Sequence, residues 1–160
     1  MTSSRLDIAL QLAEKHGMDF RANLVIGGNY VSAIEHHGLV YVSGQVPRIG
    51  STVVVTGRVG EVVSLAQAQA GAEVCALRVL AILEQHCGLE RIAQVLKLNV
   101  YTQCTADFTQ LSEVADAASR LMAAVLGQSG PHTRTSVGVY QLPKNATVEL
   151  DAVVALRDPA

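Results

Sequence analysis

The sequence lacks several features that define common classes of protein. Its 160 residues include no Trp and only four Tyr and two Phe, too few for the aromatic stacking platforms of proteins that bind single-stranded RNA. Twelve Lys and Arg stand against fourteen Asp and Glu, for a formal net charge of -2. This balance provides no basic surface for a phosphate backbone, so we expect no nucleic-acid partner.

Cysteine pairing and metal-binding spacings are also missing. The three cysteines, Cys75, Cys87 and Cys104, are odd in number and form no CxxC pair. Neither a disulfide framework nor a zinc site is indicated, so we expect no metal.

Membrane and secretion signals are absent as well. No run approaches the ~18 uninterrupted apolar residues of a membrane span. Residues 1–17 form an amphipathic pattern without the basic start and apolar centre of a signal peptide. We therefore expect a cytoplasmic protein with no membrane partner.

The composition indicates one well-packed domain. About half of the residues (49%) are apolar and only 16% are charged, which argues against disorder. A chain of 160 residues can build one substantial core, whereas two cores would be too small.

Hydrophobic periodicity predicts helices and strands in the order α, then β-β-β-α-β-α-β-β. Helices are predicted at 4–16, 64–87 and 107–126, and strands at 30–37, 39–45, 52–55 and 95–101, with two more between 134 and 156. Each long helix has one apolar stripe, so both should cover the same face of one mixed sheet in a two-layer α+β sandwich. The opposite sheet face, which includes Tyr41, stays uncovered and half apolar, a pattern typical of self-association.

Charged residues interrupt the last two predicted strands. We interpret residues 142–145 as a hairpin turn, with Glu149 opposite Gly138 and with Arg134 about four residues, or ~13 Å, further along. Burial of charge is costly, so Arg134 and Glu149 should both lie on the uncovered sheet face and mark a site. At that separation they would face a shared ligand, or a neighbouring chain would complete the site.

Three sequence segments resemble a known family. LVYVSGQVP (39–47), VLKLNVYTQCTADFTQLSEV (95–114) and RTSVGVYQLPKNATVELDAVVAL (134–156) resemble the Rid family, also called YjgF/RidA or L-PSP. The match divides the chain into an N-terminal helix and loop (1–24), typical of a longer subgroup, and a RidA-like domain (25–157). The resemblance implies a chorismate-mutase-like fold of the Bacillus type in a homotrimeric barrel, with clefts between subunits.

The resemblance also implies an activity and the residues that perform it. RidA-type members hydrolyse 2-imino acids or their enamine tautomers to 2-keto acids and ammonia, without a metal or organic cofactor. Arg134 matches the arginine that binds the substrate carboxylate, Glu149 the glutamate that positions water, and Tyr30 the tyrosine of the cleft. The substrate-binding residues implied by the match are Ser43, Gly44, Ser112 and Ser136, of which Ser112 and Ser136 replace a frequent Asn and a frequent Cys.

Other functions fit the same residues. Arg134 could form a structural ion pair at an interface, and Glu149 could form a salt bridge between subunits. The chain could be a non-catalytic trimer that binds a small imino, keto or other carboxylate. An endoribonuclease or translation inhibitor, as in the family label, is disfavoured by the lack of a basic patch. Fold alone does not decide between these functions.

Overall fold

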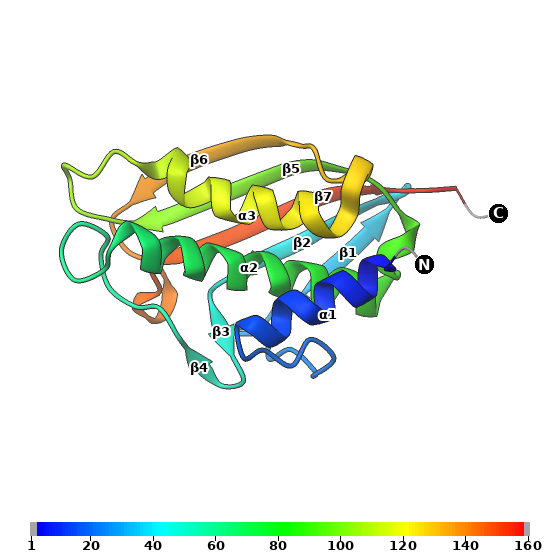
Figure 1. Ribbon diagram of the computed structural model, residues 1–160, viewed down its shortest axis with the longest axis horizontal. Helices are drawn as coiled ribbons and strands as arrows, with labels where there is room; N and C mark the ends of the chain where they lie inside the picture. Colours follow the sequence, from blue (N-terminus) through cyan, green and yellow to red (C-terminus); the bar gives the residue numbers. More distant parts are fainter. Residues whose placement is uncertain (1–2, 159–160) are drawn as a thin grey trace.

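The computed structural model describes residues 3–158 and arranges them in two layers, with helices in front of a twisted sheet (Figure 1). The helices are α1 (Arg5–Lys15), α2 (Leu65–His86) and α3 (Leu111–Leu126). The main sheet contains β1 (Ala33–His36), β2 (Leu39–Gln45), β5 (Ile92–Gln103), β6 (Thr133–Val139) and β7 (Val148–Leu156). A small separate ribbon pairs β3 (Arg48–Ile49) with β4 (Thr52–Val53). Short 3-10 turns lie at Leu89–Arg91, Gly127–Ser129 and Pro143–Asn145.

Local hydrogen bonds fix where α1 and α2 begin. A capping box at Ser4 starts α1, and a second at Ser64 starts α2, where the hydroxyl accepts from the Gln67 backbone. By length and composition α2 is apolar enough to cross a membrane, but 67% of its most apolar window is buried, which makes it the core helix.

The start of α3 differs from the prediction. The helix begins at Leu111, not near 107. The backbone N–H of Phe108 donates to the Thr105 carbonyl at 3.3 Å, so a separate turn precedes the helix. Phe108 precedes the helix and still packs against the core.

The strand order is β1-β2-β7-β5-β6, which corrects the predicted hairpin of the last two strands. β7 pairs antiparallel with both β2 and β5, and β6 pairs parallel with the far side of β5. Parallel neighbours need a long crossover, and α3 provides it between β5 and β6. The segment 140–147 therefore steps across the end of β5, and Glu149 aligns with Tyr101, not with Gly138.

The two faces of the sheet have different environments. Alternate residues of β7, starting with Val148 and Leu150, are buried under α2 and α3. The other face exposes apolar side chains, including Ile34 (56% exposed), Tyr41 (50%) and Val137 (38%). Both long helices cover one face, as predicted, and the apolar character of the other supports association. The homotrimeric barrel stays a prediction.

The N-terminal helix is anchored by one arginine. Arg5 Nη1 donates to the carbonyls of Leu89 (2.8 Å) and Ile92 (2.9 Å), and Nη2 donates to the Leu126 carbonyl (3.1 Å) and Ser129 Oγ (2.7 Å). The side chain is only 14% exposed. One guanidinium thus ties α1 to the ends of α3 and of the turn before β5.

We expect Arg5→Ala to lower the free energy of unfolding by about 1–3 kcal/mol, because buried acceptors lose a charged donor. Chemical denaturation of the whole chain measures the change. Lys15→Ala, an exposed position in the same helix, is the matched control and should change the midpoint little. An equal midpoint for Arg5→Ala and Lys15→Ala would show that the anchor contributes no stability.

Candidate functional site

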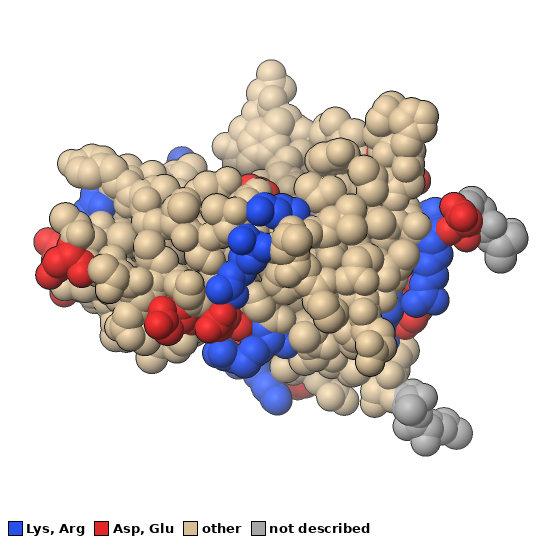
Figure 2. Space-filling view, turned by 90° about the horizontal axis from the view of Figure 1, so that it is seen from above, with Lys and Arg blue, Asp and Glu red and all other residues tan. Residues whose placement is uncertain are grey.

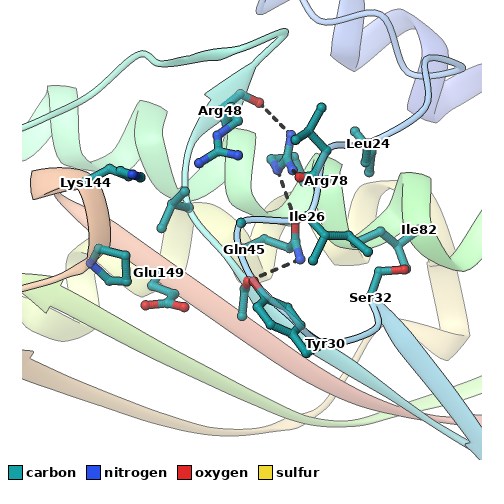
Figure 3. A pocket seen from close by; sticks show the side chains of 15 residues that line it. Leu24, Ile26, Tyr30, Ser32, Gln45, Arg48, Arg78, Ile82, Lys144 and Glu149 are labelled. Atoms are coloured by element: carbon teal, nitrogen blue, oxygen red, sulfur yellow. Dashed lines mark hydrogen bonds between the residues drawn. The ribbon is translucent and has the colours of Figure 1, made fainter.

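A cavity of about 170 Å³ lies where β2 ends and β7 begins. Its walls come from the loop before β1, the end of β2, the start of β3, two positions in α2, the 143–144 turn and the start of β7 (Figure 3). The cavity contains three of the predicted site residues, Tyr30, Gly44 and Glu149.

Glu149 reaches the cavity because of the strand alternation in β7. Its neighbours Val148 and Leu150 are fully buried on the helix side, so Glu149 points to the opposite face. The β2–β7 pairing shifts register between Val42 and Gln45, which places Gly44 against the glutamate. A Cβ atom at Gly44 would overlap Oε1 of Glu149 and lie 3.0 Å from Cδ. Only glycine leaves room for the carboxylate at this position.

The environment of Glu149 changes its acidity. Burial raises the pKa of the Glu149 carboxyl, and the negative charge of Asp151 on the same strand raises it further. Asp151 accepts a hydrogen bond from Asn99 at 2.8 Å, which holds it in place. Glu149 is therefore disposed to exchange a proton closer to neutral pH than an ordinary glutamate.

Tyr30 and Ser43 occupy different positions around this cavity. Tyr30 lies in the loop before β1, not at the predicted strand start, and is 51% exposed at the cavity wall. Ser43 does not line the cavity, and its hydroxyl donates to the Val31 carbonyl at 2.7 Å. Ser43 thereby fixes the loop that carries Tyr30.

Three cations also line the cavity, and the sequence reading missed them. Arg78 projects from α2 and is 4% exposed, and it donates to Gln45 Oε1 (3.1 Å) and to the Arg48 carbonyl (3.0 Å). Arg48 and Lys144 line the same space from β3 and from the turn before β7 (Figure 3). A sequence signal did exist, because Arg78 is the one charged residue within the apolar run 74–83.

Arg134 lies elsewhere, which corrects the prediction that it shares the uncovered sheet face with Glu149. It aligns with Leu98, a fully buried residue, so its side chain points to the helix side of the sheet. Its Nη1 donates to Asp116 Oδ1 at 2.8 Å and to Ser119 Oγ at 3.0 Å. Arg134 and Glu149 therefore occupy opposite faces, on strands separated by β5.

The other two predicted residues accompany Arg134. Ser136 follows it on the same face of β6, and the Ser112 carbonyl at the start of α3 lies 3.5 Å from Arg134 Nη2. His132 joins this group, since its Nε2 lies 2.9 Å from Ser119 Oγ. The predicted site is thus divided between a cavity at β2 and β7 and the free edge at β6.

Metal-binding geometry is not found in the described part of the chain. Within residues 3–158, no group of three His, Cys, Asp or Glu side chains is arranged to hold a metal ion. The cavity contains one carboxylate and three cations, a donor set that suits a small anion and proton transfer better than a cation.

Comparison with known proteins gives a consistent family assignment. The model of the family described as Endoribonuclease L-PSP matches residues 21–156. Protein TCP17 of Trypanosoma cruzi is 37% identical over 147 residues, covering 91% of this chain and 92% of that protein. A 2-iminobutanoate/2-iminopropanoate deaminase of Dermatophagoides farinae is 26% identical over 130 residues, covering 81% and 87%.

A solved structure extends the likeness over nearly the whole chain. Atu1372 of Agrobacterium tumefaciens, a protein of unknown function, superposes with a TM-score of 0.83 at 37% identity, covering 96% of this chain and 95% of that one. The matched region includes both strands that carry Arg134 and Glu149. The motifs, the two-layer fold and these likenesses agree, and the chain belongs to the Endoribonuclease L-PSP family, the Rid family expected from its sequence.

Proposed function

We propose that this chain is a RidA-type deaminase that hydrolyses 2-imino acids, or their enamine tautomers, to 2-keto acids and ammonia. The observation that carries the proposal is a carboxyl group of raised pKa, Glu149, in a small cavity. Such a group can accept a proton from water and return it to a leaving amine. The likeness to a protein named as an imine deaminase supports this reaction class.

The proposed reaction needs few catalytic groups. Glu149 accepts a proton from water as the water oxygen bonds to the imine carbon, which is electrophilic when its nitrogen is protonated. The same proton then passes to nitrogen and the C–N bond breaks. As ammonia leaves and the carbonyl group forms, Glu149 takes the remaining hydroxyl proton and passes it to the ammonia. The atoms and charge balance as protonated imine plus water giving ketone plus ammonium.

In this proposal the substrate carboxylate is held by Arg134 of a neighbouring subunit in a homotrimer. Arginine suits the role because its guanidinium can form two parallel hydrogen bonds with a carboxylate. Support comes from its place on β6, the free edge of the sheet, and from the apolar uncovered face. Within one chain Arg134 and Glu149 lie on opposite faces, so they can meet at one ligand only between chains.

A second function has a specific observation in its favour. Arg134 already binds Asp116 and Ser119, as a structural ion pair would, whereas the cations that line the cavity can hold a small carboxylate without it. This favours a non-catalytic trimer that binds small carboxylates. The ribonuclease label of the family finds less support, because the face in Figure 2 shows Lys and Arg interleaved with Asp and Glu on a mostly uncharged surface. Continuous positive charge is what a phosphate backbone requires.

A coupled assay tests the deaminase. Amino-acid oxidases generate 2-imino acids in the assay mixture, and semicarbazide traps the imino acid that is not hydrolysed. We expect the wild type to suppress trapping and to release ammonia, and we expect Arg134→Ala and Glu149→Gln each to lose at least about 100-fold in kcat/KM. Lack of turnover by the wild type on every imino acid would leave the binding trimer as the better function.

Mixing the two variants tests whether subunits share sites. If each site takes Arg134 and Glu149 from different subunits, random mixed trimers of Arg134→Ala and Glu149→Gln contain both native residues in about one quarter of their sites. Refolding the variants together should then restore about that share of activity. No recovery in mixed trimers would show that one chain supplies both residues.

The raised pKa of Glu149 predicts a pH effect on stability. The folded chain holds this proton more tightly than the unfolded chain, so the contribution is complete below the ordinary pKa of 4.5 and is lost as pH rises through the raised value. Glu149→Gln should therefore melt at a higher temperature than wild type at pH 7, and the difference should vanish near pH 4. Glu61→Gln, at an exposed position, is the control. An equal change in melting temperature in both variants would show that the effect does not come from the raised pKa of Glu149.

The contact at Gly44 predicts an effect on activity. Ala at this position would displace the Glu149 carboxylate, so we expect kcat to fall by at least about tenfold, because misplaced catalytic groups lose rate steeply. Circular dichroism should show an intact fold. Gly71→Ala is the control, since its Cβ would meet Val55 at 3.4 Å, an ordinary contact. Full activity of Gly44→Ala would show that the position of the Glu149 carboxylate does not matter for the reaction.

A further inference from the structure

The cavity around Glu149 holds more positive charge than the proposed hydrolysis uses. Arg48, Arg78 and Lys144 all line it. In residues 3–158 the ion pairs involve Arg5, His16, His86 and Arg134, and none of the three cavity cations takes part in one. Three cations against one carboxylate leave an excess of positive charge in a concave site, which favours an anionic ligand.

Arg78 is fixed in place by neutral groups. Its guanidinium donates to Gln45 Oε1 and to the carbonyls of Arg48 and Val25, the last at 3.5 Å. Burial lowers the pKa of Arg78, and the charge of Arg48 lowers it further. Because a buried charge without a counter-ion is costly, an anion in the cavity would stabilise this arrangement.

Arg48 is the cation with unused hydrogen-bonding capacity. Its Nε atom is buried and has no hydrogen-bond partner. The Arg78 bond holds the Arg48 backbone, and the Arg48 side chain points into the same open space as the Lys144 ammonium, in the cavity that Glu149 also lines (Figure 3). A guanidinium and an ammonium that converge in this way can bind one carboxylate through charge-assisted hydrogen bonds.

We propose that Arg48 and Lys144, supported by Arg78, form a subsite for a second acidic group on the ligand. The inference rests on the proposed function, in which Arg134 takes the 2-carboxylate and Glu149 serves the imine carbon. The preferred substrates are then 2-imino acids whose side chain ends in a carboxylate. A cavity of about 170 Å³, below the roughly 300–1,000 Å³ of sites for drug-sized ligands, restricts that side chain to a short one.

The test compares acidic and neutral substrates in the coupled assay. Imino acids made from aspartate and glutamate are measured against those made from leucine and methionine. We expect the wild type to favour the acidic pair in kcat/KM, and we expect Arg48→Met to lower the acidic-to-neutral ratio by at least about tenfold, as for loss of one charge-assisted bond. Arg48→Lys should recover part of the ratio.

Two further variants guard against misfolding and general charge effects. Lys144→Asn removes the exposed ammonium while keeping a residue that tolerates the positive φ of 58° at this position, and it should also lower the ratio. Arg91→Gln removes an exposed cation outside the cavity and should leave the ratio as in the wild type.

A binding measurement separates this inference from the proposed function. Calorimetry with 2-oxoglutarate and 2-oxobutanoate reports the subsite without turnover. Preference for 2-oxoglutarate that Arg48→Met abolishes would support the subsite even if no imine is hydrolysed. Turnover of neutral imino acids as fast as acidic ones, with a ratio unmoved by Arg48→Met, would overturn the subsite and leave the deaminase intact.

Discussion

The arrangement of the molecule depends on the alternation of one central strand. β7 has a partner strand on each side and helices over one face, so every second side chain must be apolar. The residues between them, Glu149 and Asp151, are thereby directed to the other face as a close acidic pair. Burial is the larger cause of the raised pKa of Glu149, and the alternation raises it further because it holds the Asp151 carboxyl on the same side of the strand.

Much of the fold could be predicted from local patterns, whereas the pairing of the strands could not. Ser64 correctly predicted the start of α2. The alternation of apolar residues in β7 correctly predicted the sheet face on which Glu149 lies. The side chain of Arg134 was placed on the wrong face because β6 is an edge strand whose orientation is set by its register with β5. The Pro-containing segment 142–145 reads like a hairpin turn, and only the tertiary structure shows that residues 140–147 step across the end of β5.

The predicted site was found in two parts, and this division has a physical origin. A sheet has two edges and two faces. Residues that belong to one sequence motif can therefore lie on different strands and on opposite faces of the sheet. Arg134 sits at an edge where its neighbours Asp116 and Ser119 satisfy it. The cavity at Glu149 has cations of its own. Arg78 could not be recognised as one of them from the sequence, because a single arginine among the apolar residues of a helix does not indicate which way its side chain points.

The anchor at Arg5 has a consequence for how the chain is made. Its four acceptors lie between 84 and 124 residues further along the sequence. Of the three helices α1 is synthesised first, yet the bonds to Leu126 and Ser129 cannot form until α3 and the turn after it have also been synthesised. The anchor of α1 is therefore complete only after both long helices have been synthesised, so the position of this helix is fixed by residues far along the chain.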